Sequence, residues 1–333
     1  MRPIFHPRTV NGPFDDPGLF ISFLFDKRAV LFDLGDIYSL SSKDILKISH
    51  VFVSHTHMDH FSGFDRLLRL SLGRNKDIHL YGPEGFLNNI EGKLAGYSWN
   101  LVQNYTNSLI LHATEIKPNQ QLTKTYRCIN KFYPDSKVII TGFNKILFEE
   151  PAFSISTLIL DHEIPCLGFS IKERFHINII KENVEALGLE IGPWLKNLKD
   201  ALFKQQDPDS EFEVFVNENK KKFILGELSK KIVLMTEGQK ITYIGDVAFN
   251  KYNIDKIIEF AKNSDHLYIE ASFLHKDCAL AEKKFHLTAR QAGYLAAMAK
   301  TKQFTIFHFS PRYFGYEKDL YNEAKEEYGK YIK

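Results

Sequence analysis

Short apolar runs that end in polar residues recur along this chain of 333 residues. Such runs are typical of buried strands, and apolar residues at helical spacing are typical of helices packed on a sheet. Six runs predict strands: Ala29–Phe32, Val51–Val53, Phe153–Leu160, Ile241–Ile244, His266–Ile269 and Phe304–Phe307. Three stretches predict helices: Gly63–Leu72, Lys251–Lys262 and Thr288–Lys300. Thr288 followed by Gln291 is the pattern of a helix-capping box. Strands alternating with helices predict a layered α/β or α+β fold.

One segment, residues 172–231, lacks this regular alternation. It contains Gly188, the pair Gly192-Pro193 and the polar stretch KQQDPDSE, and further along three consecutive lysines, Lys220, Lys221 and Lys222. Charge runs usually lie on a solvated surface, so composition alone favours a solvated insertion; an arm that grips a partner is the alternative. We therefore predict one domain over residues 1–333 with an insertion at 172–231.

The composition narrows the class of protein. With 44% hydrophobic and 25% charged residues, the chain is neither collagen, nor a coiled coil, nor mainly disordered. The 43 Lys and Arg nearly balance the 41 Asp and Glu, so any binding of nucleic acid must be local. Cys128, Cys166 and Cys278 form no CxxC pair, which points to a reducing compartment. No signal peptide or membrane-spanning run is apparent, so we expect a cytoplasmic protein that does not associate with a membrane.

The sequence has thirteen histidines and only three cysteines, so imidazole and carboxylate groups would hold any bound metal. The stretch His55-Thr56-His57-Met58-Asp59-His60 directly follows an apolar strand. Alternate residues of an extended segment leave on the same side, so a loop here can fold its polar groups inward. A surface loop with chance histidines is the weaker interpretation.

Three further residues also follow apolar strands: His162, Asp246 and His308. Four strand ends that deliver His and Asp residues are what a dinuclear site at one edge of a sheet sandwich requires. Two cations need about eight donor positions, counting waters and a bridging carboxylate. Five histidines, two aspartates and a bridging hydroxide complete that number.

The complete motif set resembles the metallo-β-lactamase superfamily, and within it the ribonuclease Z family of tRNA 3′-processing endonucleases. The superfamily pattern is HxHxDH followed in order by His, Asp and His. Three further stretches are similar to ribonuclease Z motifs, and the likeness runs from about Ala29 to Tyr313. They are residues 160–169 (LDHEIPCLGF), residues 308–313 (HFSPRY), and Glu270-Ala271-Ser272-Phe273 with His286-Leu287-Thr288-Ala289-Arg290.

The resemblance implies an α+β fold, a four-layer αβ/βα metallo-β-lactamase sandwich with an inserted arm. It also implies two divalent metal ions, zinc first, with manganese or iron as alternatives. The first ion would be held by His55, His57 and His162, and the second by Asp59, His60 and His308, with Asp246 bridging.

The implied reaction is endonucleolytic removal of the 3′ trailer from pre-tRNA by a metal-bridged hydroxide. Asp59 would accept a proton from the attacking water, and His286, oriented by Glu270, would protonate the leaving ribose oxygen. Arg312 and Ser310 would contact phosphate.

The resemblance also turns the insertion at 172–231 into a candidate exosite for tRNA, and a homodimer is implied. Its candidate phosphate-binding residues are Lys196, Lys199, Lys220, Lys221 and Lys222.

Two other functions remain open. One is a small-molecule phosphodiesterase or arylsulfatase-like hydrolase on the same fold, because fold does not fix function and the opening RPIFHPRTVNGPFDDPG departs from the family's glycine-rich first loop. The other is a non-catalytic nucleic-acid-binding protein with a structural metal, against which the complete ligand set argues.

Overall fold

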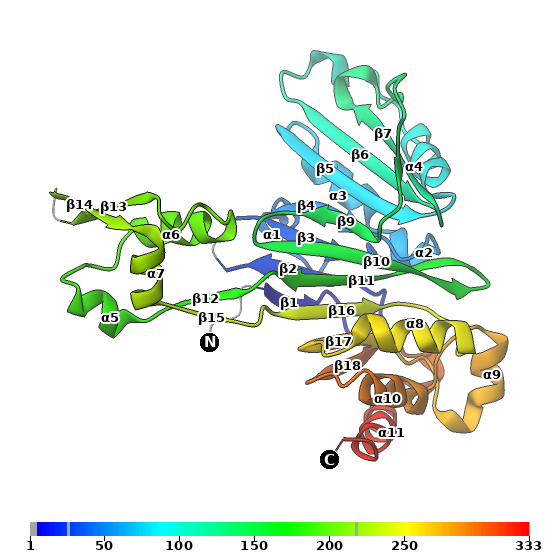
Figure 1. The fold of residues 1–333 in the computed structure, drawn as a ribbon. Coiled ribbons are helices and arrows are strands. Elements are labelled where there is room, and N and C mark those ends of the chain that lie inside the picture. Colours follow the sequence, from blue (N-terminus) through cyan, green and yellow to red (C-terminus); the bar gives the residue numbers. More distant parts are fainter. Residues whose placement is uncertain (1–4, 25–26, 217–218, 333) are drawn as a thin grey trace. The chain divides into compact units, whose positions relative to one another are not determined.

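The computed structural model describes residues 5–24, 27–216 and 219–332, and it divides into two compact units (Figure 1). The larger unit holds the described residues up to Leu147, then Ile155–Ile171, then the described residues from Lys240 onward. The smaller unit contains Phe148–Ser154 and Lys172–Gln239. Within the described ranges, no helix is both long and apolar enough to cross a membrane.

The first sheet of the larger unit has eight strands in chain order. Its central strands β3 to β6 run parallel, and antiparallel strands flank them on both sides. Parallel strands are usually buried on both faces, which fits the nearly continuous apolar sequence of this sheet's middle. The strands are β1 (Phe5–Thr9), β2 (Leu19–Phe23), β3 (Ala29–Phe32), β4 (Ile48–Phe52), β5 (Lys76–Pro83), β6 (Leu109–Ile116), β7 (Gln120–Arg127) and β8 (Ile139–Gly142).

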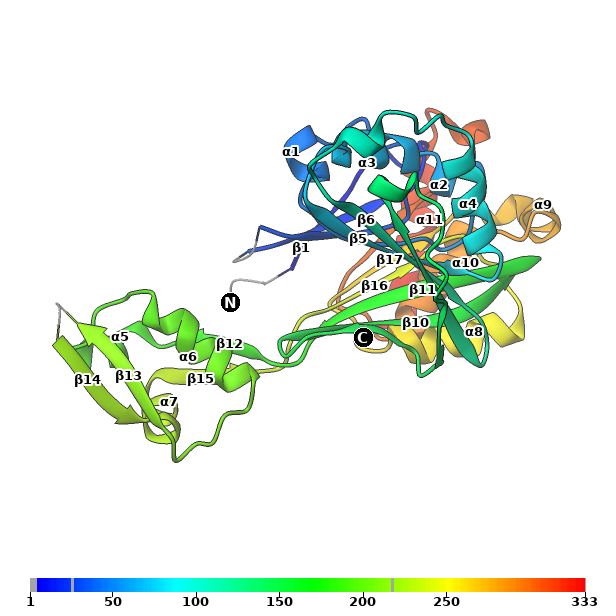
Figure 2. The ribbon, with the colours of Figure 1, turned by 90° about the horizontal axis from the view of Figure 1, so that it is seen from above.

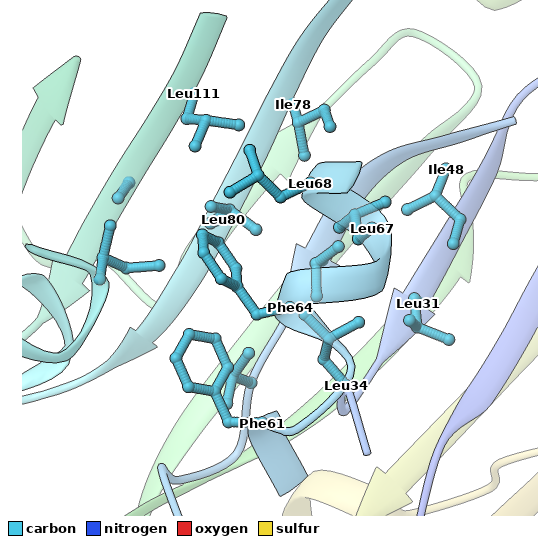
Figure 3. Close-up of a cluster of buried hydrophobic side chains, with 14 of the residues drawn as sticks. Leu31, Leu34, Ile48, Phe61, Phe64, Leu67, Leu68, Ile78, Leu80 and Leu111 are labelled. Carbon is cyan, nitrogen blue, oxygen red and sulfur yellow. The ribbon is translucent and has the colours of Figure 1, made fainter. Parts of the chain in front are cut away.

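Helices cover one face of this sheet, and α3 shows how (Figure 3). Phe64, Leu67 and Leu68 are spaced three and four residues apart, so they share one face of the helix. That face packs on Ile78 and Leu80 of β5, in one buried apolar cluster. The helices of this region are α1 (Ser42–Ile45), α2 (Met58–Phe61), α3 (Phe64–Ser71) and α4 (Phe86–Ala95), with the short 3-10 helices η1 (Val102–Asn104) and η2 (Cys128–Asn130).

The second sheet has the strand order β18-β17-β16-β11-β10-β9. Strands β16, β17 and β18 are parallel, and helices connect them. Its strands are β9 (Ile146–Glu149), β10 (Phe153–His162), β11 (Ile164–Glu173), β16 (Lys240–Ile244), β17 (His266–Glu270) and β18 (Phe304–Phe307). Its helices are α8 (Lys251–Ala261), η3 (His275–Asp277), α9 (Cys278–Lys283), α10 (Ala289–Met298), η4 (Pro311–Tyr313) and α11 (Glu317–Gly329). Thr288 and Gln291 form the predicted capping box at the start of α10.

Aromatic side chains fill the space between the two sheets of the larger unit. The ring centroid of Phe32, on β3, lies 5.3 Å from that of Phe169 on β11 and 6.0 Å from that of Tyr243 on β16. A second apolar cluster lies between the second sheet and α8 to α11. Figure 2 shows α8 and α10 next to the strands of this sheet. The order helices, sheet, sheet, helices confirms the predicted four-layer α+β architecture.

The smaller unit contains the whole predicted arm, 172–231, and continues to Gln239. It has two pairs of antiparallel strands, β12 with β15 and β13 with β14. Its elements are β12 (His176–Ile179), α5 (Lys181–Ala186), α6 (Trp194–Phe203), β13 (Glu211–Val216), β14 (Asn219–Ile224), α7 (Leu225–Ile232) and β15 (Val233–Thr236). A separate apolar cluster includes Val184, Trp194, Leu198, Val214 and Leu228. The insertion is therefore a folded unit with its own core.

Candidate metal centre

The sequence-predicted ligands lie at the ends of four strands of the larger unit. His55 and His57 follow β4, His162 is the last residue of β10, and Asp246 and His308 follow β16 and β18. The strand expected at Phe153–Leu160 thus runs two residues further, which places His162 inside it.

Asp59 and His60 lie on the short helix α2 and not in a loop. Close backbone packing explains this placement. A Cβ atom on Gly35 would lie 2.3 Å from the carbonyl oxygen of Asp59, and one on Gly63 would lie 2.2 Å from the carbonyl oxygen of Gly35. Because both positions are glycine, the backbone just before α3 can lie close to the loop that follows β3.

Asp246 lies at the centre of the cluster. Its Oδ2 atom is 3.4 Å from Nε2 of His60, 3.7 Å from Nε2 of His162 and 3.8 Å from Nε2 of His55. His55 and His57 have ring centroids 4.4 Å apart. One ligand atom from each of His55, His57, His162 and Asp246 lies within 4.8 Å of the others.

A second group lies on the other side of Asp246. Nε2 of His308 is 3.0 Å from Oδ2 of Asp59, and Nε2 of His60 is 3.7 Å from the same oxygen. Nδ1 of His308 lies 3.0 Å from Oδ1 of Asp246. Ligand atoms of Asp59, His60 and His308 also lie within 4.8 Å of one another. The structure therefore brings all seven predicted ligands together in two groups that meet at Asp246.

The chemistry of this donor set fits a divalent cation. The Nε2 atoms of His55 and His60 are buried and have no hydrogen-bond partner among the described residues. Buried polar atoms are almost always paired, and leaving one unpaired costs about 1–3 kcal/mol. Imidazole nitrogen and carboxylate oxygen are ligands of Zn²⁺, Mn²⁺ and Fe²⁺ alike. The cluster is a divalent-metal site in the composition and placement of its ligands.

The local electrostatics also favour a positive charge at this point. Burial disfavours the charged form of His60, but the carboxylates of Asp246 and Asp33 outweigh it and raise the pKa of His60 to about 10. Burial, with the neighbouring His60, lowers the pKa of His55 to about 2 and keeps its imidazole neutral. A neutral imidazole beside buried carboxylates is the form that coordinates a metal.

Asp33 holds His60 in place from the side away from the cluster. Oδ2 of Asp33 accepts hydrogen bonds from Nδ1 of His60 at 2.8 Å and from the hydroxyl of Tyr243 at 2.7 Å. The other oxygen, Oδ1, accepts from the backbone N–H of Ser54 at 2.6 Å. Such outer contacts fix the tautomer of a ligating histidine and aim its other nitrogen at the metal. No local sequence pattern pointed to this contact between Asp33 and Tyr243.

Two other supports were also invisible in the sequence. Nδ1 of His162 donates to the carbonyl of Phe285, at 2.8 Å, and Phe285 itself adopts a left-handed φ of 58°. The Sγ atom of the buried Cys166 lies 3.1 Å from the carbonyl oxygen of Asp246 and donates to it. Cys166 is therefore a buried residue that braces the metal-site backbone.

His286 and Glu270 lie beside the cluster as a pair. Nδ1 of His286 is 3.1 Å from Oε1 of Glu270, and Glu270 is fully buried. The backbone N–H of Val247 and the hydroxyl of Ser272 also donate to Glu270, at 3.0 Å each. Burial disfavours the imidazolium of His286, but the Glu270 carboxylate outweighs it and raises the pKa of His286. The pair can hold a proton next to the cluster.

A surface hollow of about 240 Å³ opens onto these residues. Asp59, His286, His308 and Ser310 line it, and the contact of Ser310 with phosphate stays a prediction. Arg312 is not among its lining residues. Its guanidinium lies 3.7 Å from Oδ1 of Asp277, in a separate hollow.

The five predicted arm lysines all belong to the smaller unit. Lys196 is exposed, and Lys199 is half-buried, with a pKa lowered by burial. On the β13–β14 hairpin, Lys220 and Lys222 form ion pairs with Glu213 at 2.5 Å and Glu211 at 2.6 Å. Residues 172–239 carry 11 Lys and Arg against 12 Asp and Glu. The unit as a whole is not basic, so any contact with phosphate depends on single exposed lysines, such as Lys221.

Curated proteins resemble this chain over most of its length. Ribonuclease Z of Microcystis aeruginosa is 31% identical over 309 residues, which cover 89% of this chain and 80% of that protein. The chain belongs to the ribonuclease Z family. Ribonuclease Z of Deinococcus radiodurans is 26% identical over 279 residues, covering 83% of this chain and 80% of that protein. No family model matches the chain.

Solved structures show the same fold at low identity. The metallo-β-lactamase fold protein YhfI of Bacillus subtilis superposes with a TM-score of 0.55 at 16% identity, covering 96% of this chain and 92% of that one. The short form of human tRNase Z superposes with a TM-score of 0.51 at 18% identity, covering 93% of each chain. The ribonuclease Z family member described here thus has the metallo-β-lactamase fold, as the family resemblance implied.

Proposed function

We propose that this chain is the endonuclease that removes the 3′ trailer from pre-tRNA, cutting after the discriminator nucleotide. Two observations support this proposal. The chain belongs to the ribonuclease Z family, and its cluster of five histidines and two aspartates stands next to a buried acid–histidine pair. The observation that carries the proposal is that Glu270–His286 pair, because a metal site that only stabilises the fold has no use for it.

Seven residues would hold two divalent cations, preferably Zn²⁺. His55, His57 and His162 would bind the first, Asp59, His60 and His308 the second, and Asp246 both, which the two groups that meet at Asp246 support. When bound, such cations supply Lewis-acid stabilisation of phosphoryl oxygens and lower the pKa of a coordinated water. The protein's own contribution is the fixed orientation of the ligands, since Asp33 and the Phe285 carbonyl hold the far nitrogens of His60 and His162.

Asp59 and His286 divide the proton transfers between them. The Asp59 side chain is 41% exposed and faces the hollow, and Nε2 of His308 is beside it. We assign it to orient the attacking water and to accept its proton. His286 gives its proton to the leaving 3′ oxygen, because a ribose alkoxide is a poor leaving group. Glu270 is the positioning residue that holds Nδ1 of His286. The products are a 3′-hydroxyl and a 5′-phosphate.

We assign tRNA binding to the smaller unit and infer that the enzyme is a homodimer. The support is the unit's independent core, which lets it fold as a stable module, and the exposed lysines Lys196 and Lys221. Lys199 is half-buried, and Lys220 and Lys222 are held by glutamates. We therefore expect them to contribute less to phosphate binding than the exposed pair.

A cleavage assay with two substrates tests the proposal. The protein is purified, its metal content is measured, and it is given a pre-tRNA with a 3′ trailer and bis(p-nitrophenyl) phosphate, a small diester. We expect a single cut in the pre-tRNA and a much higher kcat/KM for it than for the diester. Turnover of the diester alone would contradict the proposal and favour a small-molecule phosphodiesterase.

A further inference from the structure

The hollow at the metal centre carries a side chain that the family motifs do not include. Besides the cluster, its walls are Phe14, Asp15 and Asp16 from the loop between β1 and β2, residues 309–311, and Lys284. Three carboxylates therefore line it, those of Asp15, Asp16 and Asp59. Lys284 is the one lysine or arginine among the described lining residues. A polyanion entering here meets negative walls except at the cluster and at this lysine.

The basic residue expected to meet the phosphate is turned elsewhere. The guanidinium of Arg312 pairs with Asp277 and lines the neighbouring hollow together with Tyr313 and Tyr316. The hydroxyl of Tyr313 donates to the second oxygen of the same Asp277. The Asp277 carboxylate thus engages both side chains and neutralises the charge of Arg312.

Lys284, in contrast, has no ion-pair partner among the residues that the structure describes. Its side chain is exposed, and no carboxylate of the described chain lies within ion-pair distance of its Nζ atom. Several other lysines of the larger unit do have such partners, among them Lys302 with Asp265 at 2.7 Å and Lys93 with Asp65 at 3.1 Å. A lysine at the mouth of a carboxylate-lined hollow thus retains its full charge for a ligand.

The backbone around Lys284 is fixed by the metal site itself. Its N–H bonds to the carbonyl of Leu280 at the end of α9, and the N–H of His286 bonds to the carbonyl of Ala281, at 3.0 Å. Between them, the Phe285 carbonyl accepts the hydrogen bond of His162. Lys284 therefore lies on a short turn that next provides the backbone contact to His162, at Phe285, and then the proposed acid, His286.

We propose that Lys284 binds a non-bridging phosphate oxygen of the RNA backbone in the hollow, and so sets the register of the substrate relative to His286. The inference rests on the proposed function. Lysine suits this task as a mobile point charge, because its ammonium can follow the phosphate as the nucleotide settles. Arg312 is, on this view, a structural residue of the neighbouring turn.

The test measures pre-tRNA cleavage against salt concentration for Lys284→Ala, Lys284→Arg and the control Lys283→Ala. Lys283 is an exposed lysine of the same turn that does not line the hollow. We expect Lys284→Ala to lower kcat/KM by about 10- to 100-fold, the range for a charge-assisted hydrogen bond. The slope of log(kcat/KM) against log[salt] should fall by about 0.7 to 0.9, the value for one lost phosphate contact. Lys284→Arg should restore most of both, and Lys283→Ala should resemble wild type.

The small diester shows which phosphate is bound. An equal loss on bis(p-nitrophenyl) phosphate would place Lys284 on the cleaved phosphate, and a loss on pre-tRNA alone would place it on a flanking one; either result supports the inference. Equal behaviour of Lys284→Ala and Lys283→Ala would overturn it, and so would a loss in Lys284→Ala and Lys284→Arg alike accompanied by lowered metal content. If wild-type protein itself fails to cut pre-tRNA, the proposed function fails first.

Discussion

Charged and titratable groups are arranged in contrasting ways in the metal centre and in the β13–β14 hairpin of the smaller unit. In the metal centre His55, His60 and Asp246 are buried, and Asp246 comes from a segment far along the chain from the two histidines. In the hairpin Lys220 and Lys222 are exposed, and each forms an ion pair with a glutamate of the neighbouring strand, two positions away from its register partner. Buried charges without full compensation destabilise a fold, whereas exposed ion pairs contribute little either way.

This contrast shows where binding chemistry is concentrated. A cluster that burial makes costly is retained for what it binds, and in this protein that is a cation. A paired surface lysine has already found a neutralising partner, so it has less to offer an RNA phosphate. Substitutions in the two regions should therefore differ in size and in kind, and the following predictions run from the largest expected effect to the smallest.

Asp246→Asn should have the largest effect. It removes the charge at the meeting point of both ligand groups, and several kcal/mol of transition-state stabilisation corresponds to a loss of about 10³-fold or more in kcat. Metal content per chain, measured by mass spectrometry, should fall with it, while far-ultraviolet circular dichroism keeps its native shape. A variant that lost its metal but kept its activity would separate the cluster from catalysis.

His286→Ala should lower the rate of pre-tRNA cleavage by about 10²- to 10⁴-fold, the usual contribution of a general acid. The loss on bis(p-nitrophenyl) phosphate should be far smaller, because p-nitrophenolate leaves without being protonated. Glu270→Gln should act in the same direction and less strongly, since it only positions the imidazole. Equal losses on both substrates would assign His286 to metal binding. The His286→Ala variant should then also contain less metal than the wild type.

Trp194→Ala tests the smaller unit without touching the metal centre. Its indole lies in the unit's own core, and its Nε1–H donates to the carbonyl of Glu190 at 2.8 Å. Truncation should destabilise this unit by about 3–5 kcal/mol. Hydrogen exchange should rise within residues 172–239 and remain unchanged in β16 to β18. Pre-tRNA cleavage should fall, with turnover of the small diester preserved; a parallel loss of both would mean that the unit also supports the metal centre.

Single lysines of the smaller unit should have the smallest effects, and their order is informative. Lys196→Ala removes an exposed charge with no ion pair among the described residues, so it should lower the salt slope of pre-tRNA cleavage by about 0.7 to 0.9. Lys222→Ala removes a charge that is already paired with Glu211, so it should change the salt slope less. The reverse order would show that the hairpin lysines leave their glutamates for RNA.

The sequence predicted the metal ligands more completely than the residues that hold those ligands in place. The spacing within residues 55–60 is local, and the other ligands follow apolar runs, so both signals survive without a structure. Tyr243 contacts Asp33 across 210 residues, and no local pattern announces such a pair. The direction of the Arg312 side chain depends on Asp277, whose nearness follows from folding alone.

The smaller unit shows the same division. Irregular alternation and a lysine run set residues 172–231 apart, but they did not reveal a core built around Trp194 and Leu198. Nor did they reveal that glutamates face Lys220 and Lys222, because strand register decides which side chains meet across a hairpin. Lys284 was overlooked because it belongs to no motif and becomes relevant only when α9 places it at the hollow.

The most direct test of the central claim measures metal stoichiometry and pre-tRNA cleavage in one titration. Protein stripped with a chelator is reloaded with increasing Zn²⁺, and bound metal and trailer release are followed together. We predict no cleavage without metal and recovery of activity as the bound metal approaches two ions per chain. Trailer release by stripped protein, or full loading with no cleavage at all, would contradict the account.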